Sequence, residues 1–175
     1  RCMTLPRAEA LVEFAHALLA RSGLRDDIAG DVAEILVDGD LMGHTTHGLA
    51  LAAPYLGELE KGSMTKAGAP TVVAKLPATQ TWDGGRLPGP WLTLRALDAA
   101  MAMASTHGTG TVVIRRSHHI ACLEAYLKRA TDRGMMALVY SSDPVAASVA
   151  PFGAVSPVFT PNPLAAGIPT SGDPI

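Results

Sequence analysis

The spacing of apolar residues changes near residue 67. Before that point it follows the three- and four-residue steps of helices with one buried face. The apolar face of the first expected helix, which Thr4 can cap, consists of Leu11, Phe14, Ala15, Leu18 and Leu19. A second helix is expected from Asp26 or Asp27, and a third begins near Thr45 or Thr46 and ends at Gly62. Residues 1–67 are therefore predicted to form a helical domain.

After residue 67 short β-branched runs alternate with helical segments. Strands are expected at 71–75, 79–82, 111–114 and 135–140, and helices at 91–105 and 123–133. Beyond residue 141 Pro, Gly and Ala dominate, which is typical of loops with short strands. The fold class predicted is α+β (α/β), with a second domain of mixed α/β structure over residues 68–175.

Composition excludes several classes of protein. The 175 residues are 48% hydrophobic and 17% charged, with a net charge of -2, so a packed core is expected and a nucleic-acid binder is not. No apolar run approaches the ~20 residues that span a bilayer, and the first residues do not resemble a signal peptide. Cys2 and Cys122 form no disulfide framework. We therefore expect a cytoplasmic protein.

Residues 43–48, Gly-His-Thr-Thr-His-Gly, carry the first candidate site. They lie at a predicted helix start, where backbone N–H groups favour an anion such as a substrate carboxylate. Imidazole titrates near neutrality, so His47 could exchange a proton with a reacting oxygen or nitrogen while Thr46 orients it. Two alternatives remain: the Thr-His pairs only cap the helix, or His44 and His47 bind a metal.

A second candidate site is Ser117-His118-His119, between an expected strand and helix. Adjacent side chains point in different directions, so at most one of the two histidines is expected to face a shared site. The neighbouring Arg115 and Arg116 either bind phosphate or carboxylate or form a solvated basic turn. A third candidate is the polar turn around Thr160 and Asn162. No Gly-x-Gly-x-x-Gly lies between a strand and a helix, so a Rossmann site is not predicted.

Several stretches of the chain, taken in sequence order, resemble motifs of the type 2 malate/L-lactate dehydrogenase family. They are residues 40–48, Tyr55, 82–85, 117–119, 151–153 and 160–164. The resemblance implies a helical domain beside a non-Rossmann α/β domain, and a homodimer that uses NAD or NADP. The reaction it implies is hydride transfer to or from a small 2-hydroxy/2-oxo acid or a cyclic imino acid.

The resemblance also implies roles for individual residues. His47 would be the acid–base residue, assisted by Thr46. The cofactor would contact His119, Ile120, Ala121, Cys122, Leu123, Thr160 and Asn162. The substrate would contact His44, Tyr55 and His119. No metal is implied.

The chain departs from the family pattern at some positions. Ala50, followed by Leu51, stands where many members carry an Arg that clamps the substrate carboxylate. The stretch His119-Ile120-Ala121 is closer to the piperideine-2-carboxylate reductase branch. The next family element, which carries an Asp, would begin past Ile175, so the α/β domain is expected to be incomplete and the 175-residue chain alone inactive or feebly active.

Two rival functions remain open at this stage. One is a ligand-binding or inactive protein that keeps the fold without transferring hydride. The other is a metal hydrolase that uses His44, His47 and His119.

Overall fold

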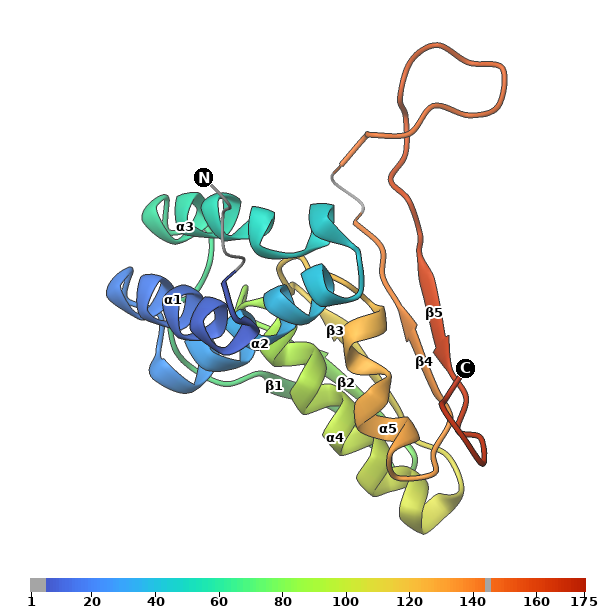
Figure 1. Ribbon diagram of the computed structural model, residues 1–175. Coiled ribbons are helices and arrows are strands. Elements are labelled where there is room, and N and C mark those ends of the chain that lie inside the picture. Colours follow the sequence, from blue (N-terminus) through green and yellow to red (C-terminus); the bar gives the residue numbers. More distant parts are fainter. Residues whose placement is uncertain (1–5, 144–145) are drawn as a thin grey trace. The chain divides into compact units, whose positions relative to one another are not determined.

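A computed structural model describes residues 6–143 and 146–175 of the chain (Figure 1). Two compact units follow one another along the chain, the first ending at Tyr126 and the second comprising Leu127–Ile175. Within the described residues no helix is long and apolar enough to cross a membrane. The domain boundary expected near residue 67 remains a prediction.

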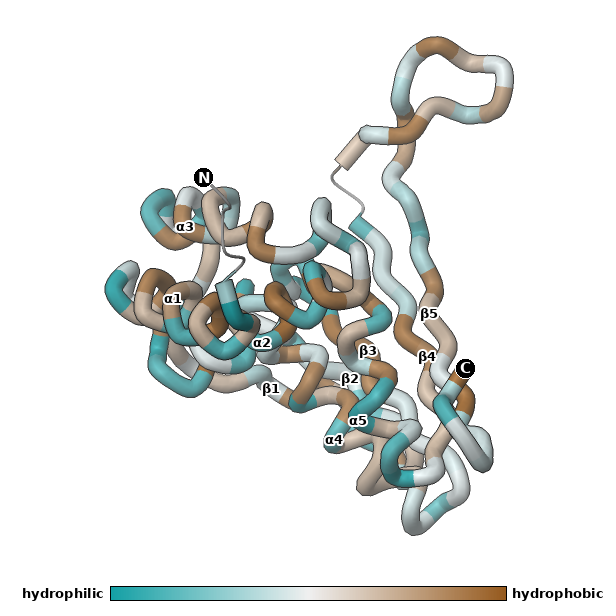
Figure 2. Tube along the Cα trace, in the orientation of Figure 1, coloured by the Kyte–Doolittle hydropathy of each residue, from teal (hydrophilic) through white to brown (hydrophobic). Residues whose placement is uncertain are grey.

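The first unit opens with the helices that the periodicity predicts. They are α1 (Ala8–Arg21), α2 (Asp26–Leu41) and α3 (Ala52–Glu60). The helix α1 packs on α2, whose buried face comprises Ile28, Ala29, Val32, Ala33, Ile35, Leu36, Val37 and Gly39. Figure 2 shows hydrophobic and hydrophilic residues alternating along both helices, as one-sided burial requires. Phe14, expected on the inner face of α1, is instead 64% exposed, and Thr4 lies outside the described residues.

A three-stranded sheet completes the first unit. Its strands β1 (Thr71–Leu76) and β2 (Thr79–Asp83) are antiparallel, and β3 (Thr111–Arg115) pairs in parallel with β2. A parallel pair needs a long connection, which is supplied by α4 (Gly89–His107), and this helix packs on β3. Gly108, at φ 79°, ends α4 in the left-handed conformation that glycine tolerates. The predicted strands and the predicted helix at 91–105 are confirmed.

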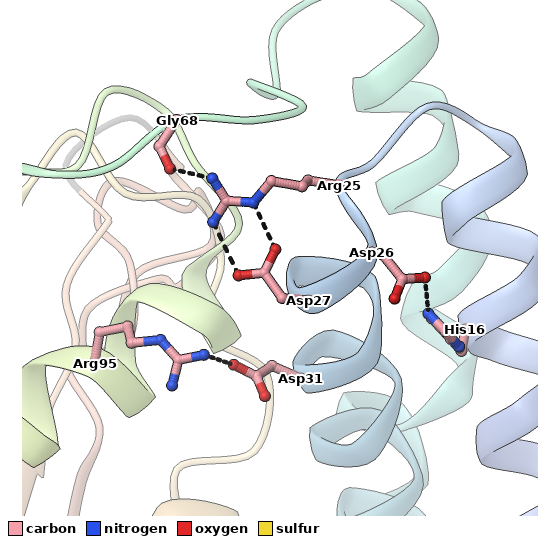
Figure 3. A network of polar contacts seen from close by, with 7 residues as sticks. All are labelled: His16, Arg25, Asp26, Asp27, Asp31, Gly68 and Arg95. Carbon is pink, nitrogen blue, oxygen red and sulfur yellow. Dashed lines mark hydrogen bonds and ion pairs between the residues drawn. The ribbon is translucent and has the colours of Figure 1, made fainter.

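Polar contacts join α2 to α4 and to the segment before β1 (Figure 3). Arg25 donates two hydrogen bonds to Asp27 and a third, at 2.8 Å, to the carbonyl of Gly68. Arg95 pairs with Asp31 at 2.8 Å. The indole ring of the buried Trp91 lies 5.3 Å from the guanidinium of Arg25 and 5.4 Å from that of Arg95. These contacts hold the first two turns of α4 against the first half of α2.

The second unit is a β-ribbon with one short helix. It contains α5 (Lys128–Thr131), β4 (Ala137–Tyr140) and β5 (Leu164–Gly167), and the two strands are antiparallel. The long loop between them contains an isolated bridge from Val149 to Phe159. The predicted strand at 135–140 and the predicted loops after 141 are confirmed.

The single helix predicted over 123–133 is wrong. The chain forms a 3₁₀ turn, η3 (Glu124–Tyr126), followed by α5. The break falls where the two units meet in the sequence: Tyr126 is fixed in the first unit by a hydrogen bond from its hydroxyl to the carbonyl of Ile120. Leu127 packs against Gly167 of the second unit, so the two neighbours are held by different partners.

The turn after β2 continues the pairing of β2 and β3 beyond both strands. The N–H of Gly84 donates to the carbonyl of Arg115, and the N–H of Arg86 donates to the carbonyl of Arg116, both at 2.8 Å. The carboxylate of Asp83 accepts from the N–H of Gly85 at 3.0 Å and pairs with both arginines. The pKa of the Asp83 carboxyl is lowered mainly by the hydrogen bond from Gly85 N–H, and to a smaller extent by the charges of Arg116 and Arg115.

Asp83→Asn should therefore change how stability depends on pH. A carboxyl whose pKa is lower in the folded chain contributes stability above its unfolded pKa, about 3.9, and loses it as the pH falls through the folded value. The free energy of unfolding of the wild type should exceed that of Asp83→Asn by a constant amount at neutral pH. Urea titrations should show the difference shrinking below about pH 4; a difference that stays constant down to pH 2 would contradict the assignment.

Candidate functional site

The segment that carries His47 consists of two 3₁₀ turns, η1 (Thr45–His47) and η2 (Leu49–Leu51), before α3 begins at Ala52. The single helix predicted from Thr45 or Thr46 to Gly62 is therefore wrong: a 3₁₀ turn begins at Thr45, and the α-helix begins only at Ala52. Gly48 between the turns is extended, at φ -98° and ψ -142°, and the N–H of Leu49 donates to the carboxylate of Asp40 at 2.9 Å. The carboxylate of Asp40 already accepts a hydrogen bond from this N–H. We therefore no longer expect a helix N-terminus beside His47 to bind an anion.

The imidazole rings of His47 and His119 are stacked. Their centroids are 5.6 Å apart and their planes differ by 29°. Thr46 Oγ1 lies 2.9 Å from Nδ1 of His47, which leaves Nε2 as the nitrogen that can face a substrate. Both histidines are exposed. The structure thus brings together three residues that the sequence places in two separate candidate sites.

His119 is held from the protein side. The hydroxyl of Tyr55 lies 3.0 Å from the carbonyl oxygen of His119 and 3.2 Å from its Nδ1. The N–H of Ala121 also donates to Nδ1, at 3.2 Å. To make this bond Ala121 adopts φ 56°, a conformation that costs a residue with a side chain about 1–2 kcal/mol. The backbone conformation of this loop therefore serves the orientation of the His119 ring.

Two buried tyrosines support the loop that carries His119. Tyr55, on α3, is 3% exposed, and Tyr126 is fully buried with its hydroxyl bonded to the carbonyl of Ile120. Burial raises the pKa of both tyrosines, because it disfavours the phenolate. Both hydroxyls therefore keep their protons and act as hydrogen-bond donors. Tyr55, expected to contact substrate, is shielded from solvent and bonds to His119.

His44 forms an ion pair with Glu124, at 2.9 Å between Nε2 and Oε2. Both side chains are about half exposed, so the pair adds little stability, but it links the residue before η1 to η3. The sequence analysis missed Glu124 and also the role of Asp40. Asp40 lies close enough to Leu49 in the sequence to suggest a cap, whereas nothing local links Glu124 to His44.

The two adjacent histidines point in different directions, as expected. His118 Nε2 lies 2.7 Å from the carbonyl of Ser63, so this ring joins the loop to the segment after α3. Arg115 and Arg116 are paired with Asp83. Both guanidinium groups are more than half exposed and stabilise the turn after β2 through Asp83, which fits the solvated basic turn better than a site for a free anion.

The remaining residues expected to contact a cofactor lie in both units. Ala121 and Cys122 are buried, and Ile120 and Leu123 are half-buried. Thr160 and Asn162 belong to the second unit, where they line an open hollow of about 260 Å³ together with Asp143 and Phe159. Across residues 6–143 and 146–175 no three His, Cys, Asp or Glu side chains gather as a metal site would require, so the metal hydrolase gains no support.

Comparison with known proteins connects this arrangement to one family. The model of the malate/L-lactate dehydrogenase family matches residues 7–175, and the chain belongs to that family. It is 29% identical over 169 residues to the 2,3-diketo-L-gulonate reductase of Mannheimia succiniciproducens, covering 97% of this chain and 50% of that protein. The chain thus spans about half the length of the curated relatives it matches.

Solved structures of the family share the fold. The malate dehydrogenase of Pyrococcus horikoshii matches with a TM-score of 0.90 and 27% identity, over 98% of this chain and 49% of that one. The delta1-piperideine-2-carboxylate reductase of Pseudomonas syringae matches with a TM-score of 0.82 and 26% identity, over 99% of this chain and 52% of that one. The fold class expected from the sequence and the resemblance to the family are confirmed.

Gly89, the first residue of α4, should not tolerate a side chain. A Cβ there would lie 2.3 Å from the carbonyl oxygen of His119 and 2.4 Å from that of His118, and neither backbone group can move without displacing the site. We expect Gly89→Ala to lower the free energy of unfolding by roughly 2–3 kcal/mol.

The control is Gly30→Ala in α2, where a Cβ meets nothing within 4 Å. It should raise stability by about 0.5–1 kcal/mol. Urea unfolding of both variants measures this, and equal effects would contradict the close approach.

Proposed function

We propose that this protein is an oxidoreductase that transfers hydride between a nicotinamide cofactor, NAD or NADP, and a small 2-hydroxy/2-oxo acid. The observation that carries the proposal is the pair of stacked imidazoles in a chain of this family, with Thr46 on Nδ1 of His47. Within this pair His47 supplies the proton exchange that hydride transfer to or from a C–O bond requires.

His47 acts as the acid–base residue. When Nδ1–H donates to Thr46 Oγ1, the lone pair of Nε2 is available to accept the proton of a substrate hydroxyl. In the reverse direction Nε2 of the imidazolium returns that proton to the carbonyl oxygen of the 2-oxo acid. The bound nicotinamide supplies the hydride acceptor or donor. Thr46 keeps the ring in the orientation and tautomer that both directions need.

The residues expected to hold the cofactor have suitable chemistry. The exposed ring of His119 offers a flat surface of the kind a nicotinamide ring can pack against, and Thr160 and Asn162 offer hydrogen-bonding groups for its polar parts. Ile120 and Leu123, both half-buried, offer apolar surface beside His119. Taken by itself, each of the two groups of residues suits part of a nicotinamide dinucleotide.

His44 and the missing arginine bear on how the substrate carboxylate is bound. Ala50 and Leu51 provide no charge for a carboxylate, whereas His44, with Glu124 as its partner, is exposed near His47 in the chain. We propose that His44 contacts the substrate. The similarity to a piperideine-2-carboxylate reductase makes a cyclic imino acid the second candidate substrate, in which a C=N bond replaces the C=O bond. A homodimer in the cytoplasm remains a prediction.

His47→Ala should abolish turnover while leaving the fold intact. General acid–base residues contribute about 10²–10⁴-fold, so we expect kcat to fall by at least about 100-fold. The assay follows NADH and NADPH oxidation with pyruvate, oxaloacetate, phenylpyruvate and piperideine-2-carboxylate, on protein expressed from its complete reading frame. His107→Ala, an exposed histidine at the end of α4, is the matched control and should keep full activity.

Two results would contradict the proposal. If His47→Ala keeps more than about a tenth of wild-type kcat, His47 is not the proton-transfer residue. If a folded wild type turns over none of the substrates with either cofactor, the proposed activity is contradicted, and a ligand-binding protein without hydride transfer becomes the favoured alternative. Assaying the 175-residue chain alongside tests the expectation that it is inactive by itself, which equal turnover would contradict.

A further inference from the structure

The contacts on His119 Nδ1 determine where the proton of that ring lies. A backbone N–H can only donate, so the bond from Ala121 N–H at 3.2 Å requires a lone pair on Nδ1. In a neutral imidazole with Nδ1 as acceptor, the proton is on Nε2. This contact therefore selects one of the two tautomers of His119.

Tyr55 holds His119 where this contact with Ala121 forms. Its hydroxyl donates to the carbonyl oxygen of His119 at 3.0 Å, and the hydroxyl oxygen lies 3.2 Å from Nδ1. The phenol is 3% exposed, and water therefore does not compete for this proton. The ring of Tyr55 also meets that of His119 edge-on, with centroids 6.4 Å apart and planes at 68°. Backbone and ring of His119 are thus held by one side chain.

The rings of His47 and His119 differ in what contacts Nδ1. In His47 this nitrogen faces the hydroxyl of Thr46, which can accept or donate, so the ring can take up and release a proton without losing the contact. In His119 it faces the N–H of Ala121, which cannot accept. Protonating Nδ1 of His119 would set two donors against each other. Protonation of Nδ1 therefore costs His119 its contact with Ala121, whereas it costs His47 no such contact.

We propose that Tyr55 is a positioning residue that, with the N–H of Ala121, holds His119 as the neutral Nε2–H tautomer. The proton of the His119 ring is then fixed on Nε2, and the division of roles between the two rings follows from their contacts at Nδ1. This proposal rests on the proposed function only for the use to which the donor is put, namely to bind the substrate oxygen. The tautomer itself is a property of the chain without any ligand.

The first experiment reads the tautomer directly. Two-bond ¹H–¹⁵N correlation spectra of ¹⁵N-labelled protein at pH 7.5 distinguish a protonated from an unprotonated ring nitrogen, and His119→Gln identifies the resonances. We expect Nδ1 of His119 to be unprotonated and Nε2 protonated. A dominant Nδ1–H form, or a doubly protonated ring, would overturn the proposal whatever the activity of the protein.

The second experiment compares two buried tyrosines. Tyr55→Phe removes the hydroxyl that faces His119, whereas Tyr126→Phe, the matched control, removes a buried hydroxyl that bonds to the carbonyl of Ile120. We expect an Nδ1–H form of His119 to become detectable in Tyr55→Phe only. The loss of one hydrogen bond should lower kcat/KM by about fivefold to tenfold in Tyr55→Phe.

The remaining outcomes also decide. An unchanged His119 spectrum in Tyr55→Phe, or an equal change in Tyr126→Phe, would overturn the role of Tyr55. If the wild type has no dehydrogenase activity, the proposed function fails, but the two spectra still test the tautomer. The two hypotheses therefore fail independently.

Discussion

Close contact of main chain with main chain positions both histidines. At Gly39 on α2, a Cβ would lie 3.0 Å from the carbonyl oxygen of His47 and 3.2 Å from Cβ of Cys122. At Gly89, the start of α4, it would lie 2.3 Å from the carbonyl oxygen of His119. Hydrogen in place of a side chain at these two positions lets the loops that carry His47 and His119 approach the helices closely enough for their rings to stack.

Hydrogen bonds divide the polar side chains around the two histidines into those that hold the backbone and those that contact an imidazole. Asp40 and His118 serve the backbone, since the first accepts from Leu49 N–H and the second contacts the carbonyl of Ser63. Buried Tyr55 fixes His119, whereas exposed Thr46 contacts His47. Tyr55 is shielded from water and the two rings are exposed, so His119 is held by a buried support.

Membership of the malate/L-lactate dehydrogenase family gives this arrangement a chemical context. Relatives about twice as long as this chain act, by their names, on hydroxy and oxo acids, and one structural relative acts on a cyclic imino acid. In all of these reactions a heteroatom gains or loses a proton as carbon gains or loses hydride. A histidine whose Nδ1 faces a hydroxyl and no N–H group can change protonation without losing that contact, and His47 is such a histidine.

The sequence by itself determined the helices α1, α2 and α4 and the strands β1 to β4, because apolar periodicity and turn residues are local properties. It also singled out His47, Thr46 and His119. Tertiary structure alone decided that the two histidines stack, that Tyr55 is buried against His119, and that α3 starts only at Ala52. The first two depend on groups brought together from distant parts of the chain, which no local pattern encodes because they are selected by the packing of the whole unit. The start of α3 depends on the carboxylate of Asp40, which is closer in the sequence.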